Sequence, residues 1–313
     1  MSYLKERTGI LIKEFLSCPW VIVFFATFVL FKIWSNISMG ASLVTALRTG
    51  ILGALFYLAG CYAISLLAVD NEKIKESNLS ISNKRSKTMI VIVLAYSAII
   101  FTFTYDFVLR RINGNGLLSF IPGYDVILGF INEKIAVPLS EMVEPYSRAY
   151  IFSSATGVLL YIVIPLILFS LLNFKLWKVF NLMNTRANWV FVAGYLIVFT
   201  INRPEGSILW MILATLIYPA LAEEFFHKAV VLRSVNNIAK KVGTAVVVSA
   251  LIFALMHFPE RYLISFDGNI LQTFSKIMTV GLFGVFTGYG FVKTGTIIPW
   301  VIIHALSNII SIA

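Results

Sequence analysis

Long apolar stretches separated by short polar ones set the pattern of this chain. About nine of them come near the roughly 20 apolar residues that a helix needs to cross a bilayer. The sequence therefore predicts an all-α, polytopic membrane helical bundle of about eight or nine transmembrane helices. In chain order the expected spans cover residues 20–33, 46–69, 89–109, 151–172, 189–201, 208–231, 245–258, 271–292 and 297–312. Several are short, and we expect them to continue into the flanking polar residues.

The polar segments between these stretches alternate in basic content. One of them, 70–87, carries Lys73, Lys75, Lys84, Arg85 and Lys87, and further basic residues follow the stretches that end near 172 and 231. Loops rich in Lys and Arg stay in the cytoplasm. The pattern therefore predicts a multi-pass protein with a cytoplasmic N-terminus, which we expect in a bacterial plasma membrane.

The amino-acid composition fits a membrane protein and argues against other classes of protein. Hydrophobic residues make up 59% of the chain, charged residues 13%, and the mean hydropathy is +0.87. The net charge of +10 comes from short runs between apolar segments, so it does not indicate nucleic-acid binding. The expected partners are the lipid bilayer and a membrane protein or peptide. Cys18 and Cys61 are too far apart in sequence to suggest a disulfide framework or a metal site.

The segment 110–149 differs from the rest of the chain. It contains Asn113-Gly114-Asn115-Gly116, a strong turn signal. Residues 125–140 then place apolar side chains at roughly helical spacing, which indicates an external loop with an amphipathic helix on the membrane surface. We expect residues 1–200 to form N-terminal transmembrane helices that include this loop, and residues 201–313 to form a separate catalytic helical core.

Ionisable residues interrupt the apolar stretches of the last third. They form three groups: Glu223, Glu224, His227 and Lys228; His257; and His304, which is followed four residues later by the polar but uncharged Asn308. An ionisable group inside hydrocarbon costs roughly 2.5–3.5 kcal/mol even on the lenient insertion scales. Such residues are retained where they have a function, and proton-handling chemistry is the first function to consider.

Helical spacing predicts which of these residues are neighbours. Glu224 and Lys228 are four apart, in the favourable order for an ion pair. His304 and Asn308 share a helix face by the same spacing. The spans on either side of a turn near 241–243 should form an antiparallel hairpin, which brings Glu224 and His257 to within roughly 4–5 Å in depth.

These motifs resemble those of one family. Glu-Glu-x-x-x-basic at 223–228, Phe-x-x-x-His at 253–257 and His-x-x-x-Asn at 304–308 occur in this order on separate apolar stretches. Gly284-x-x-x-Gly288 and Thr294-Gly295-x-x-x-Pro299 precede the last of them. The set is similar to the CPBP family, which includes type 2 CAAX prenyl endopeptidases and the bacteriocin-processing and Abi-type membrane proteins. The resemblance covers about residues 218–310.

The resemblance implies a glutamate-type intramembrane protease that needs no metal and no cofactor. It makes Glu223 the general base, with His257 sharing its water, and it makes His304 and Asn308 the groups that stabilise the oxyanion. Glu224 would hold the site together through the basic residue at 228. The family usually has Arg there and this chain has Lys228, which loses the two-pronged grip on a carboxylate. His227 is not a motif position, and we expect it and Phe253 to be supporting residues.

Three alternatives remain open on the sequence alone. A zinc-dependent membrane protease would use His257, His304 and Glu223 as ligands. A proton-coupled transporter would also keep intramembrane carboxylates, although it usually shows repeats or broken helices. A catalytically silent scaffold or immunity protein of the same fold would keep the cluster for structure only. Chelator sensitivity, substrate-dependent ion flux and peptide turnover separate these alternatives from a glutamate protease.

Overall fold

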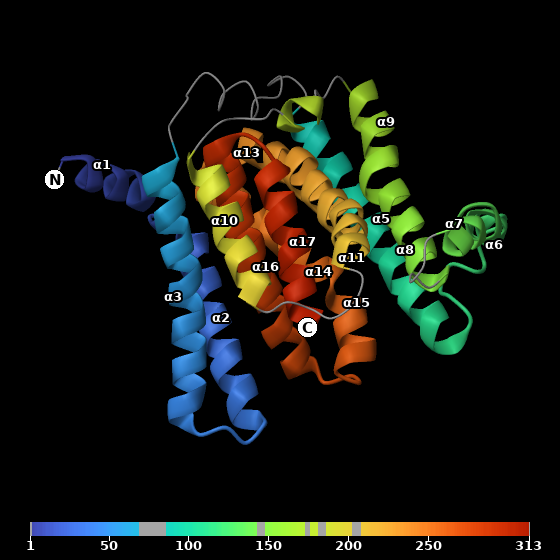
Figure 1. The fold of residues 1–313 in the computed structure, drawn as a ribbon, viewed down its shortest axis with the longest axis horizontal. Coiled ribbons are helices and arrows are strands. Elements are labelled where there is room, and N and C mark those ends of the chain that lie inside the picture. Colours follow the sequence, from blue (N-terminus) through green and yellow to red (C-terminus); the bar gives the residue numbers. More distant parts are fainter. Residues whose placement is uncertain are drawn as a thin grey trace.

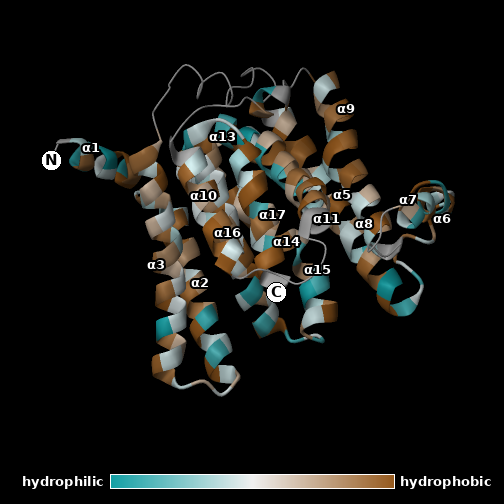
Figure 2. Ribbon diagram, in the orientation of Figure 1, coloured by the Kyte–Doolittle hydropathy of each residue, from teal (hydrophilic) through white to brown (hydrophobic). Residues whose placement is uncertain are grey.

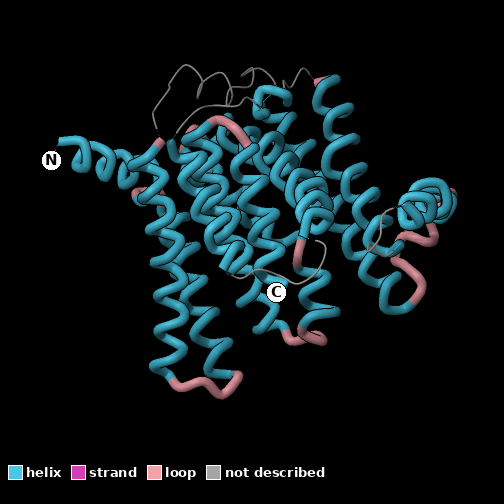
Figure 3. Tube along the Cα trace, viewed as in Figure 1, coloured by secondary structure: helices cyan, strands magenta, loops and turns pink. Residues whose placement is uncertain are grey.

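The computed structural model describes residues 2–68, 86–142, 148–172, 176–180, 186–201 and 208–312. Within these ranges the chain is helical and contains no strand (Figure 3). The basic segment 70–87 lies almost wholly outside the described residues. The elements are α1 Ser2–Leu11, η1 Ile12–Leu16, α2 Pro19–Ser38, α3 Leu43–Leu67, α5 Ser86–Asn113, α6 Tyr124–Ile131, η3 Asn132–Ala136, α7 Val137–Met142, α8 Arg148–Val158, η4 Leu159–Val163, α9 Ile164–Leu171, η5 Leu176–Phe180, α10 Arg186–Ile201, α11 Ile208–Thr215, η6 Leu216–Leu221, α12 Ala222–Glu224, η7 Phe225–Leu232, α13 Arg233–Ala239, α14 Val242–Met256, α15 Phe258–Glu260, η8 Arg261–Ser265, α16 Ile270–Thr294 and α17 Ile298–Ile312.

Five helical segments in the described ranges are long and apolar enough to cross a bilayer. They are Pro19–Ser38, Leu43–Leu67, Thr88–Asn113, Tyr150–Leu171 and Ile270–Thr294, and a bent pair, Val242–Met256 with Phe258–Ser265, makes a sixth. Much of the ribbon of these helices has the colour of hydrophobic residues (Figure 2). The chain is therefore a multi-pass, all-helical membrane protein.

The expected count of eight or nine spans is not confirmed. The segments Trp189–Ile201 and Ile298–Ile310 are helical and apolar but shorter than a full span. The stretch expected at 208–231 is broken, because Tyr218 has extended backbone angles (φ −144°, ψ 129°) and Pro219 follows it. Proline has no backbone N–H to donate to the preceding turn, so a continuous helix is not maintained there.

The three polar motifs, at 223–228, 253–257 and 304–308, lie on helices that pack closely against one another or against α16. α14 packs against α16, which also packs against the α2–α3 pair, and α17 packs against η6 and α10 (Figure 1). Gly284 permits the close contact of α14 with α16, since a Cβ added there would lie 3.3 Å from the Ala250 Cα and 3.0 Å from the Phe253 ring. Small residues at such crossings let helix backbones approach in membranes. The chain turns between α13 and α14 at Lys240, next to the turn expected near 241–243, and between α16 and α17 at Gly295.

The segment 110–149 carries the expected amphipathic unit, formed by α6, η3 and α7. Val126 and Phe130 are 74% and 60% exposed, which gives the unit an apolar outer face. Asp106 of α5 anchors its start, because the buried carboxylate accepts hydrogen bonds from Arg110 Nε (2.8 Å), the Leu118 N–H (2.6 Å) and the Tyr124 hydroxyl (2.8 Å). Burial raises the pKa of the Tyr124 hydroxyl and the Asp106 carboxylate raises it further, so Tyr124 remains a donor at physiological pH.

Candidate functional site

The first polar motif begins directly after the break at Tyr218. The Tyr150 hydroxyl donates to the Tyr218 carbonyl oxygen (3.0 Å), and Gly157 leaves room for the Tyr218 ring, which a Cβ there would overlap. The chain then resumes a helix through α12, which places Glu223 and Glu224 in the interior, where they are 8% and 1% exposed. The break therefore sets the position of the helix that carries the two carboxylates, and with it the direction of their side chains.

Glu223 faces two imidazoles from two other helices. Its Oε2 atom lies 3.7 Å from His257 Nε2 and 3.8 Å from His304 Nε2. These separations are too long for direct hydrogen bonds, and Glu223 Oε2 has no hydrogen-bond partner among the described residues. A water molecule beside Glu223 Oε2 can bridge the carboxylate and an imidazole. The hairpin prediction had paired His257 with Glu224, whereas the structure pairs it with the preceding residue.

Glu224 makes the second set of contacts. Its Oε1 atom lies 3.1 Å from His304 Nδ1, and its Oε2 atom lies 3.7 Å from Lys228 Nζ, four residues later on the same helix. Lys228 is fully buried and also donates to the Gly284 carbonyl oxygen (3.3 Å). The predicted Glu224–Lys228 pair is thus confirmed, and it joins η7 to α16.

Hydrogen bonds fix how the two imidazoles are protonated. His257 Nδ1 lies 3.0 Å from the Phe253 carbonyl oxygen, which can only accept, so Nδ1 carries the proton. In His304, Nδ1 likewise donates to the Glu224 carboxylate. In each neutral ring the Nε2 lone pair therefore points toward Glu223.

Phe253 lies among the polar residues rather than merely in the apolar core. Its ring centroid is 5.1 Å from His227, 5.0 Å from His257 and 5.7 Å from His304, and Lys228 Nζ lies 5.8 Å from it. The ring is 2% exposed. It therefore packs against all three histidine rings and beneath the Lys228 ammonium.

This region of the chain also matches a known family. Residues 204–310 match the family model described as type II CAAX prenyl endopeptidase, Rce1-like. The match includes all three motifs and confirms the resemblance drawn from them. No curated protein and no solved structure matches the chain.

The sequence predicted the position of Asn308 better than that of His227. Asn308 lies one turn beyond His304 on α17 and is half-buried, as its spacing predicts. His227 is fully buried within η7, between the rings of Phe226 (5.2 Å) and Phe253 (5.1 Å). Neither of its ring nitrogens has a hydrogen-bond partner among the described residues. His227 therefore lies in the interior of the molecule and not on the surface at the end of a helix.

Sequence reasoning missed the residues that shape the surroundings of the site. Tyr150 and Gly157, which stabilise the break, lie in the N-terminal part and carry no motif. Phe283 packs its ring 5.3 Å from His304, and Ser249 donates to the His227 carbonyl oxygen (2.8 Å). The Tyr-Pro pair at 218–219 was the one sign of this break in the sequence, because a proline inside an apolar stretch interrupts a helix.

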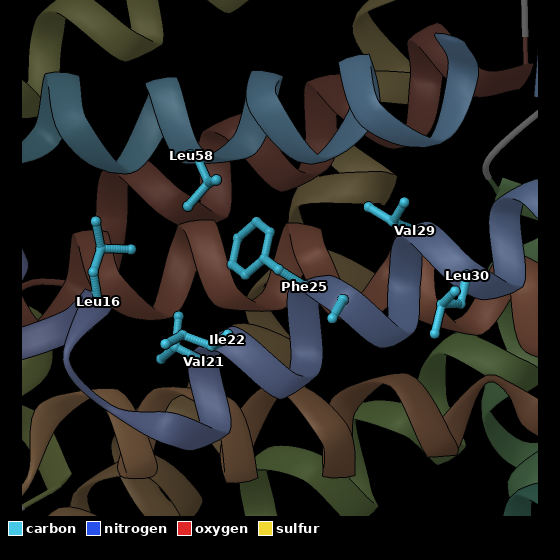
Figure 4. Close-up of a pocket in the computed structure, with 8 residues that line it drawn as sticks. Leu16, Val21, Ile22, Phe25, Val29, Leu30 and Leu58 are labelled. Carbon is cyan, nitrogen blue, oxygen red and sulfur yellow. The ribbon is translucent and has the colours of Figure 1, made fainter. Parts of the chain in front are cut away.

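Two further features define what the site is made of. Among the described residues, no group of three or more His, Cys, Asp or Glu side chains is arranged to hold a metal ion. A groove of about 510 Å³ lies along α2 and α3, lined by Leu16, Val21, Ile22, Phe25, Ala26, Val29, Leu30 and Leu58 (Figure 4). No ionisable side chain and no residue of the candidate site lines this groove.

Proposed function

We propose that the protein is an intramembrane endopeptidase that hydrolyses a peptide bond of a membrane-associated or lipid-modified protein or peptide. The observation that carries the proposal is the position of Glu223, a buried carboxylate whose Oε2 lies 3.7–3.8 Å from two imidazole nitrogens. Peptide hydrolysis needs a water activated near neutral pH and donors directed at the developing oxyanion. The match of residues 204–310 to a prenyl endopeptidase family supports the same reaction class.

The reaction can be written with these side chains. A water held between Glu223 and His257 gives a proton to the Glu223 carboxylate while its oxygen attacks the scissile carbonyl carbon. The carbonyl electrons move to the oxygen, and protonated His304 and the Asn308 amide donate hydrogen bonds to it. The tetrahedral intermediate then collapses, the C–N bond breaks, and the proton held by Glu223 passes to the leaving nitrogen.

Glu224 and Lys228 would position these groups rather than react. Glu224 holds His304 through Nδ1, and Lys228 balances the charge of Glu224 and bonds η7 to the Gly284 carbonyl of α16. A buried carboxylate without such partners is strongly unfavourable. The pair therefore supports a site whose reactive carboxylate is Glu223 alone.

Loss of one charge tests the proposal. In Glu223→Gln the amide keeps the shape of the side chain but cannot accept the proton of water, so hydrolysis should fall by at least about 100-fold, the lower range for a positioned acid–base group. Membrane peptides from cells that express the parent, Glu223→Gln or neither should be compared by mass spectrometry, with Glu6→Gln on exposed α1 as the matched control. Cleavage by Glu223→Gln at the parental rate would exclude Glu223 as the base.

The same assay separates the alternatives. A strong chelator such as phenanthroline should leave cleavage unchanged; inactivation that zinc restores would establish the zinc protease with His257, His304 and Glu223 as ligands. A parent that changes no membrane peptide would favour a silent scaffold or immunity protein.

We also propose the finer membrane arrangement. The short apolar helices Trp189–Ile201 and Ile298–Ile310, together with the broken stretch after Ile208, would bring the five or six long spans to eight or nine. The basic content of the loops supports a cytoplasmic N-terminus. A helical core at 201–313 beside N-terminal helices, in a bacterial plasma membrane, completes this arrangement.

A further inference from the structure

The two neighbouring carboxylates of the site are held in different ways. Glu224 contacts His304 Nδ1 (3.1 Å) and Lys228 Nζ (3.7 Å), whereas Glu223 Oε2 has no hydrogen-bond partner among the described residues. The position of Glu223 therefore depends on the helix that carries it. A displacement of about 1 Å in a reacting group can slow a reaction about 100-fold. The contacts that fix the start of this helix thus bear directly on the proposed reaction.

The start of this helix is the break at Tyr218, five residues before Glu223. A residue that precedes proline is disfavoured in the helical region, so Pro219 accounts for the extended backbone of Tyr218. The proline interrupts the helix but does not fix the direction in which the chain continues. Contacts with other parts of the molecule have to fix that direction.

One helix of the N-terminal part, α8, holds Tyr218 at both its backbone and its ring. The Tyr150 hydroxyl donates to the Tyr218 carbonyl oxygen (3.0 Å), and a Cβ added at Gly157 would overlap the Tyr218 ring. Tyr150 and Gly157 are seven residues apart, which is close to two helical turns, so they lie on the same face of α8. Two independent contacts from this face therefore determine where Tyr218 lies.

The next turn of the same span contacts the chain just after the carboxylates. The buried Tyr161 ring of η4 lies 5.7 Å from the Phe226 ring and 6.2 Å from the His227 ring, measured between centroids. A π-helical turn such as η4 inside an α-helix often occurs at a functional site. The span formed by α8 and η4 thus contacts the carboxylate helix on both sides of Glu223, and it lies outside the matched residues 204–310.

We propose that Tyr150 is a positioning residue for Glu223, so that the family-like region alone does not complete the site. Its hydroxyl fixes the Tyr218 carbonyl, and with it the start of the helix that brings Glu223 Oε2 to the two imidazoles. Tyr150 transfers no proton in the reaction, so its loss should slow the chemical step without weakening peptide binding. The inference rests on the proposed peptidase function.

Tyr150→Phe removes the hydroxyl and keeps the ring. The assay uses the full-length protein in phosphatidylcholine vesicles and a quenched fluorescent copy of a membrane peptide that the parent cleaves. In this variant kcat should fall at least about 10-fold, while KM should change less than about threefold. The matched control is Tyr3→Phe on α1, which removes the hydroxyl that donates to the Leu66 carbonyl oxygen (2.6 Å) and should keep both constants.

A second set of variants tests the contact with the Tyr218 ring and does not depend on the folding of Tyr150→Phe. Gly157→Ala should lower kcat, because its Cβ would overlap the ring. Tyr218→Ala removes the ring, while Pro219 keeps the backbone of residue 218 extended. In the Tyr218→Ala background, Gly157→Ala should therefore change kcat by less than about twofold, as expected for two coupled positions.

Hydrogen exchange gives a readout that does not require cleavage. In Tyr150→Phe the amides of residues 220–225 should exchange with deuterium at least about 10-fold faster than in the parent, because the start of their helix is held less firmly. Tyr3→Phe should leave the exchange of these amides unchanged. Mass spectrometry of the protein in detergent measures both variants.

Four outcomes overturn the inference. A parental kcat in Tyr150→Phe, or an equal fall in Tyr3→Phe, shows that the hydroxyl has no specific effect on the reaction. A raised KM with an unchanged kcat assigns α8 to peptide binding instead. Unchanged exchange at residues 220–225 shows that Tyr150 does not hold the break. If the parent cleaves no peptide, the proposed function fails together with the inference, and this result is distinct from cleavage that Tyr150→Phe leaves unchanged.

Discussion

At the scale of the residue, Lys228 stands where the family that residues 204–310 resemble usually has arginine. The contacts of Lys228 explain why lysine can serve at this position. An arginine grips a carboxylate with two parallel donors. Lys228 instead divides its single ammonium between Glu224 Oε2 (3.7 Å) and the Gly284 carbonyl oxygen (3.3 Å). The ammonium therefore satisfies a carboxylate and a backbone carbonyl in one buried space, as a compact point charge can.

Substitution of Lys228 tests this arrangement. Lys228→Arg should be tolerated, and its two-pronged contact with Glu224 should hold activity at or above the parental level. Lys228→Met keeps the length of the side chain but leaves Glu224 buried with only His304, so it should cost about 3–5 kcal/mol of stability. Thermal unfolding in detergent and the peptide-cleavage assay measure the two effects.

The comparison also distinguishes a positioning role from a purely structural one. If Lys228 positions the site, Lys228→Met should lower kcat with little change in KM in the fraction that remains folded. A variant as stable and as active as the parent would show that the ammonium does not support Glu224.

At the scale of the element, the amphipathic unit α6–η3–α7 is held to α5 mainly through Asp106. This carboxylate is fully buried and accepts three hydrogen bonds, whereas the Asp125 side chain is 57% exposed and forms an ion pair with Arg110 (2.7 Å). A buried acceptor with charged and neutral donors contributes far more than an exposed ion pair, which is worth about 0–1 kcal/mol.

Matched substitutions at the two aspartates should therefore differ. Asp106→Asn removes the charge and one acceptor site, so the amides of residues 117–131 should exchange with deuterium at least about 10-fold faster, which corresponds to about 1.4 kcal/mol of local stability. Asp125→Asn should change exchange there by less than about threefold. Hydrogen-exchange mass spectrometry in detergent measures both, and equal effects would show that Asp106 is not the anchor.

At the scale of the whole molecule, contacts at η1 join the N-terminal helices to α14 and α16. Glu14 accepts from Lys293 at the end of α16 (2.5 Å), and Phe15 packs against Tyr289 with ring centroids 4.7 Å apart. Cys18 lies against Gly243 at the start of α14. These contacts link residues more than 200 positions apart in sequence, so they are expected to set how the α2–α3 pair meets α14 and α16.

Removal of the Glu14 charge tests this junction. The side chain of Lys293 is 1% exposed and that of Glu14 is 29% exposed, so the hydrogen bond between them is largely shielded from solvent. Glu14→Gln weakens this charge-assisted hydrogen bond and should cost about 1–3 kcal/mol of stability. Glu6→Gln, the same change on the exposed face of α1, should be within about 0.5 kcal/mol of the parent. Thermal unfolding of both variants in the same detergent gives the comparison, and identical midpoints would mean that the junction depends on packing alone.

The break at Tyr218 shows why the span count could not be settled from hydrophobicity. Residues 208–231 are apolar enough to be counted as one span, and hydropathy does not register the backbone of Tyr218. The break is stabilised by Tyr150 and Gly157, which lie more than 60 positions earlier. Such long-range partners leave no periodic signal in the sequence.

The sequence by itself determined the helical membrane class, the turns at Lys240 and Gly295, the Glu224–Lys228 pair and the set of residues that come together. Each follows from local rules: hydrophobic length, helical spacing and the backbone freedom of a turn. Tertiary structure decided that His257 faces Glu223 while His304 contacts both carboxylates, and that Phe253 stands among the polar groups. These depend on the rotation and offset of packed helices, which side chains distant in sequence set together.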